Sequence, residues 1–187
     1  MSRVFEALCA HLKTHPEAEV QDAVKFLYQA SFGGGHFLSD PDGAYLYLLK
    51  EAEIVTFNMF TIDGRVRHGY YSEEELEEHQ IEEYSAWSAV KPFCFSLIKG
   101  KKLPESFHIV LQLSPKSTKS FLDKNQIPVA AGQVQGLYLN IRYEETKIQC
   151  VTGTSLSFFT LDKTMDQEWD KAVCQFFKVH KIPFSQM

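Results

Sequence analysis

Apolar and polar residues alternate most regularly in one stretch of the first half of the chain. Val55, Phe57 and Met59 are separated by single residues, which is the spacing of a strand with one buried face. Asp63 and Gly64 follow, and such a pair tolerates the positive φ angles of a tight two-residue turn. The pattern therefore predicts a β-hairpin that turns at this pair.

The same period of two returns in the second half of the chain. It predicts a strand over residues 107–113, a second hairpin with strands over 137–143 and 147–152, and a further strand over 156–161. Hairpins joined by short loops are typical of antiparallel sheets.

Apolar residues at helical spacing, together with helix-start signals, predict helices before, between and after these strands. The helical segments are residues 4–12, 14–30, 44–50, 73–83, 92–100 and 117–124, and a last helix from Thr164 onward. The fold class is therefore α+β: a mainly antiparallel sheet built from hairpins with helices on one face, preceded by an N-terminal helical hairpin.

The first two helices form a unit of their own in this interpretation. Three glycines at positions 33–35 end the second helix, because glycine is costly inside a helix. This Gly-rich turn is either a joint or a place where backbone amides contact a ligand. We expect residues 1–50 to form a helical hairpin appendage and residues 51–187 to form the α+β domain.

Composition narrows the class of protein. The chain has 187 residues, 44% of them apolar, and a formal charge of -5, which argues against a nucleic-acid coat. Its four cysteines are widely spaced, as in proteins of a reducing compartment. The N-terminus lacks the pattern of a signal peptide, and no apolar run spans a bilayer. These features predict a cytoplasmic location without membrane association.

Several stretches together resemble a known family. They are TFNMFTIDGR (56–65), YYSEEE (70–75), YSAW (84–87), KPFCFSLIKGKKLPESF (91–107), GLYLNIRY (136–143) and TGTSLSFFTLDK (152–163). In residue identity and in order along the chain, they resemble an uncharacterised domain-of-unknown-function family of Gram-positive anaerobic bacteria, over roughly residues 50–178. Residues 1–50 resemble the N-terminus of other uncharacterised bacterial proteins. Neither resemblance implies an activity.

One group of basic residues suggests a binding surface. It comprises Arg65 and Arg67 on the returning strand of the first hairpin and Lys91, Lys99, Lys101 and Lys102 around a helix end, with Tyr70 and Tyr71 as a stacking surface. Gathered by the sheet, these side chains would hold phosphate or carboxylate. In the alternative, the lysines interact with the free carbonyls and the dipole at a helix C-terminus, or they pair with the seven acidic residues between Glu73 and Glu83.

Other chemistry has little support in the sequence. His36, Asp40 and Asp42 form the one close group of metal-ligand types, and they sit where aspartate favours turns. Cys94 lies between two phenylalanines, which is typical of a buried, unreactive thiol. We therefore expect neither a metal site nor a cofactor.

Two hypotheses about function remain. The first is a non-enzymatic binding or regulatory domain whose basic residues engage an anionic small molecule or an acidic protein partner. The second is a small hydrolase or transferase that acts on a phosphorylated or otherwise anionic substrate. A pocket that holds a titratable group with a displaced pKa favours the enzyme, and a surface without one favours the binding domain. The sequence leaves the oligomeric state open.

Overall fold

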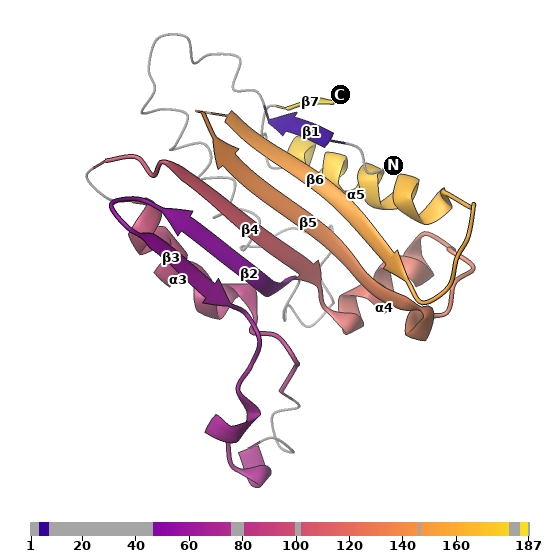
Figure 1. The fold of residues 1–187 in the computed structure, drawn as a ribbon. Coiled ribbons are helices and arrows are strands. Elements are labelled where there is room, and N and C mark those ends of the chain that lie inside the picture. Colours follow the sequence, from indigo (N-terminus) through magenta and orange to yellow (C-terminus); the bar gives the residue numbers. More distant parts are fainter. Residues whose placement is uncertain are drawn as a thin grey trace.

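The protein is built on one antiparallel sheet, which the computed structural model describes over residues 4–7, 47–75, 81–99, 102–145, 147–179 and 184–186 (Figure 1). Within these residues the sheet has seven strands in the order β3-β2-β4-β5-β6-β1-β7. The strands are β1 (Val4–Ala7), β2 (Tyr47–Val55), β3 (Met59–Asp63), β4 (Ser106–Leu113), β5 (Val134–Glu144), β6 (Lys147–Leu156) and β7 (Ser185–Gln186).

Among the described residues, three α-helices cover one face of this sheet and no helix covers the other, which we call the open face. They are α3 (Trp87–Ile98), α4 (Pro115–Lys124) and α5 (Thr164–Val179), and two 3₁₀ turns, η1 (His68–Tyr70) and η2 (Ala131–Gln133), lie in the connections. Helix α3 contacts β2, α4 contacts β5 and α5 contacts β6. In the view of Figure 1, α3 and α5 lie behind the sheet. The predicted α+β class is confirmed.

The core lies between the helices and the sheet. Along β4, residues alternate between buried and half-buried positions, as its sequence pattern predicted. The largest fully buried side chains include Trp87, Trp169, Phe107 and Phe177. The predicted side of the last helix, which carries Trp169, faces this core, and the second predicted hairpin is present as β5 and β6.

The first hairpin turns earlier than the sequence predicted. Strands β2 and β3 are joined at residues 56–58, where the Thr56 amide donates to the Asn58 carbonyl at 2.9 Å. The Asp63-Gly64 pair instead ends β3. Gly64 is required there by a close approach: a Cβ atom at this position would lie 1.8 Å from the Leu49 carbonyl oxygen. The prediction of a turn at Asp63-Gly64 was wrong because tertiary packing, not turn geometry, selects this glycine.

The helix predicted over residues 44–50 is also wrong where the structure describes it. Tyr47 to Lys50 belong to β2, which pairs with β4. The pairing shifts register between Leu49 and Glu51, so that a β-bulge forms at Lys50. The bulge interrupts the alternation of buried residues, which explains why the sequence did not read as a strand.

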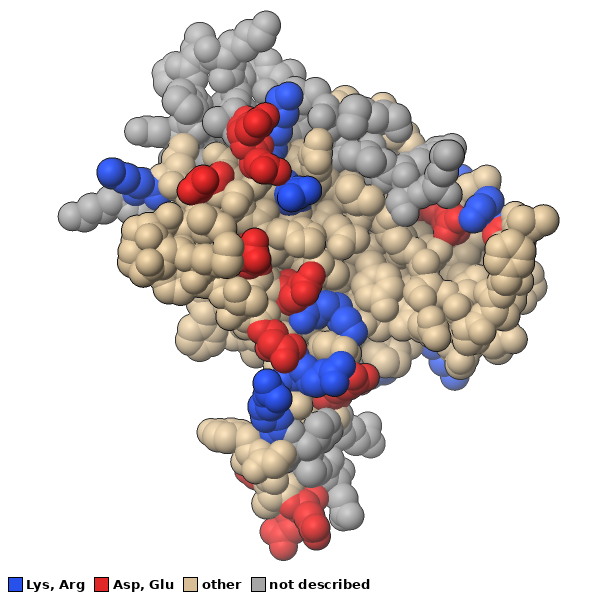
Figure 2. All heavy atoms as spheres, in the orientation of Figure 1, with Lys and Arg blue, Asp and Glu red and all other residues tan. Residues whose placement is uncertain are grey.

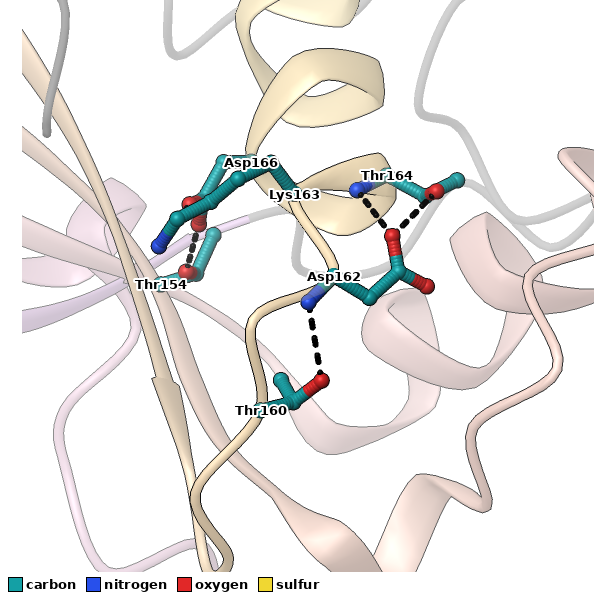
Figure 3. Close-up of polar contacts among 6 residues, drawn as sticks. All are labelled: Thr154, Thr160, Asp162, Lys163, Thr164 and Asp166. Atoms are coloured by element: carbon teal, nitrogen blue, oxygen red, sulfur yellow. Dashed lines mark hydrogen bonds and ion pairs between the residues drawn. The ribbon is translucent and has the colours of Figure 1, made fainter.

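Two further boundaries differ from the prediction. Helix α3 begins at Trp87 rather than near Pro92, because its buried residues continue at helical spacing on both sides of the proline. Strand β6 continues to Leu156, and no strand follows over 156–161. A loop leads instead to α5, where the carboxylate of Asp162 accepts the backbone N–H and the hydroxyl of Thr164 at 2.9 and 2.6 Å (Figure 3). This carboxylate caps the start of the helix.

The N-terminal residues add a strand where a helix was predicted. Val4–Ala7 form β1, which pairs with β6 and with β7. The rest of the predicted helical hairpin lies outside the described residues, and the domain division at residue 50 stays a prediction. Among the described helices, none combines the length and the apolar character that a membrane span requires.

Candidate functional site

An arm of two chain segments, joined by a β-bridge between Arg65 and Tyr84, leaves the sheet after β3 and returns before α3. We define the arm as residues 64–75 and 81–86; it projects downward from the sheet in Figure 1. Its base is held by backbone hydrogen bonds from Gly64 to Lys50 at 3.0 Å, from Ser85 to Gly64 at 2.8 Å, and from Val66 to Glu83 at 2.9 Å. The arm therefore places Arg65 and Tyr84 beside the bulged residue of β2.

The base of the arm and the open face of the sheet enclose a depression of about 510 Å³. Its lining comes from β2, β3, β4, β5 and the arm: Lys50, Glu51, Asp63, Arg65, Arg67, Tyr84, Val110 and Tyr138. Figure 2 shows blue and red side chains gathered on the face where the sheet meets the arm. The depression is thus a charged site with two tyrosines and one aliphatic side chain.

Two cations converge on the Tyr84 side chain. The Lys50 Nζ lies 3.3 Å from the centroid of the Tyr84 ring, and an Arg65 guanidinium nitrogen donates to the Tyr84 hydroxyl at 3.2 Å. The carbon of that guanidinium lies 5.7 Å from the ring centroid. A cation at such a distance is attracted by the negative face of the ring. We call Lys50, Tyr84 and Arg65 the tyrosine cluster.

Both cations change the acidity of the phenol. The nearby Lys50 ammonium group, and then the hydrogen bond from Arg65, lower the pKa of Tyr84 below its ordinary value of 10.0. In return, the hydrogen bond to Tyr84 is the largest cause that raises the pKa of Arg65. The arrangement stabilises negative charge at the hydroxyl oxygen, and it would stabilise other negative charge placed there.

Carboxylates at the rim partly offset these charges. Arg65 lies 3.6 Å from a Glu83 oxygen, and Arg67 lies 3.7 Å from an Asp63 oxygen, with 58 to 80% of each of these side chains exposed. Asp63 also accepts the Arg65 backbone N–H at 3.0 Å. Exposed ion pairs of this kind contribute between about 0 and 1 kcal/mol, so an incoming anion can compete with them.

The structure brings together two of the predicted basic residues and separates the others. Arg65 and Arg67 both line the depression. They lie on the arm and not on the returning strand of the first hairpin as predicted, because that strand, β3, ends at Asp63. Lys99 and Lys102 lie near the far end of β2, since the loop after α3 returns to Val55 through a hydrogen bond from Glu105 at 2.8 Å. Five residues of strand, about 16 Å, separate that end from Lys50. Lys101 lies outside the described residues.

The predicted stacking pair is on the arm, away from the depression lining. Tyr70 is 84% exposed, and its ring meets that of Tyr71 edge to face with centroids 5.3 Å apart. Sequence reasoning missed both Lys50 and Tyr84. A lone lysine in a strand and a tyrosine after an acidic run carry no local signal, and only the arm makes them neighbours.

A second polar group lies between β6 and the first turns of α5. The Thr152 hydroxyl donates to the buried Asp170 carboxylate at 2.5 Å. The Thr154 hydroxyl donates to Asp166, and Lys163 pairs with Asp166 at 3.3 Å (Figure 3). These contacts line a space of about 180 Å³. Since the side chains satisfy one another, the group serves to fix α5 on the sheet.

The thiols and the potential metal ligands were also candidates in the sequence. There, no three His, Cys, Asp or Glu side chains are placed to hold a metal ion. His36, Asp40 and Asp42 lie outside those residues. Cys94 is fully buried, and burial raises its pKa to about 11, as expected for an unreactive thiol.

Comparison with known proteins gives one match. A family model described as a family of unknown function (DUF5721) matches residues 44–185. No curated protein and no solved structure matches the chain. The resemblance to an uncharacterised domain is confirmed by this match, and the expected bacterial origin stays a prediction.

Proposed function

The chain belongs to the DUF5721 family, whose function is unknown, and from its own side chains we propose that it is a non-enzymatic domain that binds an anionic group at the tyrosine cluster. The observation that carries the proposal is the convergence of Lys50 and Arg65 on Tyr84. These residues come from β2 and from both segments of the arm, so the site exists only in the folded chain.

Lys50 supplies a positive charge at the tyrosine cluster. Its ammonium group lies over the Tyr84 ring, and no ion pair joins it to a carboxylate of the described residues. The side chain is half-buried, which limits the screening of its charge by water. A phosphate or carboxylate oxygen beside the ring would meet this charge directly.

Arg65 and Tyr84 supply directional hydrogen bonds to the same anion. A guanidinium carries five N–H donors, and one of them is used by Tyr84. The remaining donors can bind two oxygens of a phosphate or carboxylate at once. Arg67 adds charge at the rim of the depression, where its pair with Asp63 is exposed.

The enzyme hypothesis keeps one supporting observation, the displaced pKa of Tyr84 in the depression. In a hydrolase or transferase, Tyr84 would be the proton donor or acceptor, and Glu51 or Asp63 would be its partner. We favour binding because the half-buried Tyr84 phenol lies at an open depression and its two cations hold it as part of a charged surface. If the wild type hydrolysed a phosphoester and Tyr84→Phe did not, the enzyme hypothesis would be favoured over the binding hypothesis.

The test is a titration of the full chain with inorganic phosphate, followed by backbone amide NMR shifts. We expect saturable shifts centred on residues 50, 65 and 84. Lys50→Ala and Arg65→Ala should each weaken phosphate binding by about tenfold, because each removes one of two charges on the anion.

Lys102→Ala is the matched control, since it removes one surface lysine at the far end of β2. It should leave the dissociation constant unchanged within about twofold. Equal loss in Lys102→Ala and Lys50→Ala, or shifts that do not saturate, would overturn the proposal. Titration with an acidic peptide in place of phosphate distinguishes a protein partner from a small anion.

A further inference from the structure

Tyr138 lies across the depression from the tyrosine cluster and has an unusual placement. A Cβ atom at Gly136 would lie 2.5 Å from Cζ and 2.6 Å from the hydroxyl oxygen of Tyr138. The distal half of the ring therefore lies directly over the backbone of Gly136, on the open face of the sheet. Glycine inside a strand is costly, and here it makes room for an aromatic ring along the sheet surface.

The strand next to this ring also leaves it uncovered. Gly153 of β6 is directly opposite Tyr138 in the register of β5 and β6. A Cβ atom at Gly153 would meet nothing nearer than the Tyr138 Cβ at 3.7 Å, so the space above that glycine is open. Tyr138 is half-buried and lines the depression. One side of its ring packs on the sheet, and the other side is available to a ligand.

The distance between the ring and the cations suits a small two-part ligand. Strand β4 separates β2 from β5, so two strand spacings, about 10 Å, divide the backbone at Lys50 from that at Tyr138. Both side chains reach into the same depression, where Val110 of β4 provides an apolar floor between them. The site thus has a cationic end, an aliphatic middle and an aromatic end.

We propose that the ligand is a nucleoside monophosphate, with its phosphate on Lys50 and Arg65 and its base stacked on Tyr138. The inference rests on the proposed function, because it uses the same cations for the phosphate. Every base has a planar π face, and such faces stack on tyrosine whatever the identity of the base. The sugar would lie over Val110.

A longer nucleic acid fits the surface less well. The chain carries a formal charge of -5, and Glu51, Asp63 and Glu83 surround the cations. A strand of several phosphates would meet these carboxylates, whereas one phosphate need only meet the two cations of the cluster.

The experiment compares four probes by isothermal titration of the full chain: inorganic phosphate, ribose 5-phosphate, adenosine and adenosine monophosphate. The monophosphate should bind at least about fivefold more tightly than ribose 5-phosphate, which is the low end of what base stacking on an aromatic ring contributes. It should also bind more tightly than adenosine, which lacks the phosphate.

Variants at Tyr138 then separate stacking from charge. Tyr138→Phe keeps the ring and should keep the advantage of the monophosphate. Tyr138→Thr removes the ring, retains a residue that favours strands, and should reduce the affinity for the monophosphate to that for ribose 5-phosphate. The urea midpoint of each variant, compared with that of the wild type, reports whether the fold is intact.

The outcomes separate this inference from the proposed function. The monophosphate and ribose 5-phosphate could bind with equal affinity, both dependent on Lys50. That result would overturn the inference of a nucleotide ligand and would still support anion binding at the tyrosine cluster. If none of the four probes bound, both the nucleotide inference and the proposed anion-binding function would be overturned. A short oligoadenylate that binds at least about tenfold more tightly than the monophosphate would overturn the mononucleotide in favour of a strand.

Discussion

The Lys50 ammonium group lies 3.3 Å from the centre of the Tyr84 ring, although the two residues belong to different elements. Lys50 is at the bulge of β2. Tyr84 is on the returning segment of the arm and forms a β-bridge with Arg65. The bulge frees Lys50 from the alternation of the strand, and the arm carries the phenol to it. This contact connects the fold to the proposed binding site.

The first prediction concerns the acidity of Tyr84. Because Lys50 and Arg65 lower its pKa, the phenol should ionise below its ordinary value of 10.0. Lys50→Ala and Arg65→Ala should each shift that ionisation upward. The measurement is the ultraviolet absorbance of tyrosinate against pH, taken as the difference between each protein and the same protein with Tyr84→Phe.

The same shift has a consequence for stability. A group whose pKa is lower in the folded state than in the unfolded state stabilises the fold fully above the unfolded pKa, and this contribution is lost as the pH falls through the folded pKa. Relative to Tyr84→Phe, the wild type should therefore gain stability as the pH rises toward 10.0, and the gain should level off above that pH. A difference in urea midpoint that is constant with pH would contradict this.

The second prediction concerns Glu51, which lies directly opposite Asp63 in the pairing of β2 and β3. Two like charges in opposite positions repel each other and also repel an anion in the depression. Glu51→Gln should raise phosphate affinity by roughly threefold at low salt, and the gain should shrink as salt is added. Glu53→Gln is the control, because Glu53 faces Thr61 and does not line the depression.

The third prediction tests the close approach at Gly64. Gly64→Ala would place a methyl group 1.8 Å from the Leu49 carbonyl oxygen and 2.5 Å from its carbon, so β2 or the arm must move. We expect a loss of about 3 kcal/mol or more in the free energy of unfolding, measured by urea denaturation. Gly132→Ala meets nothing within 4 Å and should change stability by less than about 0.5 kcal/mol.

The fourth prediction compares the two tryptophans, which are both almost fully buried. The Trp169 indole N–H donates to the Tyr138 carbonyl at 2.9 Å, whereas the Trp87 indole nitrogen has no hydrogen-bond partner among the described residues. Replacing Trp169 by Phe should therefore cost about 1 kcal/mol more than replacing Trp87 by Phe. Equal losses of unfolding free energy would show that the Trp169 hydrogen bond contributes nothing net.

Sequence patterns predicted the parts of the fold in which local and tertiary preferences agree. Strand β4 alternates without interruption, and the side of α5 that carries Trp169 and Phe177 repeats at helical spacing. Each of these elements has one apolar face, and burying that face against the core is the dominant favourable term. The α+β class could therefore be predicted from the chain alone.

The patterns misled where one residue serves a distant contact. Asp63-Gly64 has the composition of a hairpin turn, but Gly64 is there because the Leu49 carbonyl leaves no room for a side chain. The bulge at Lys50 broke the alternation of β2 and made a strand resemble a helix. In both cases the constraint comes from a segment that is distant in sequence.

The sequence by itself determined the α+β class and the presence of Arg65 and Arg67 on a surface near the first hairpin. It did so because period and charge are local properties. Only the tertiary structure decided which cations meet: it placed Lys50 and Tyr84 beside Arg65 and left Lys99 and Lys102 at the far end of β2. The physical reason is that a binding site needs groups within a few ångströms, and strand register, the bulge and the arm set those distances.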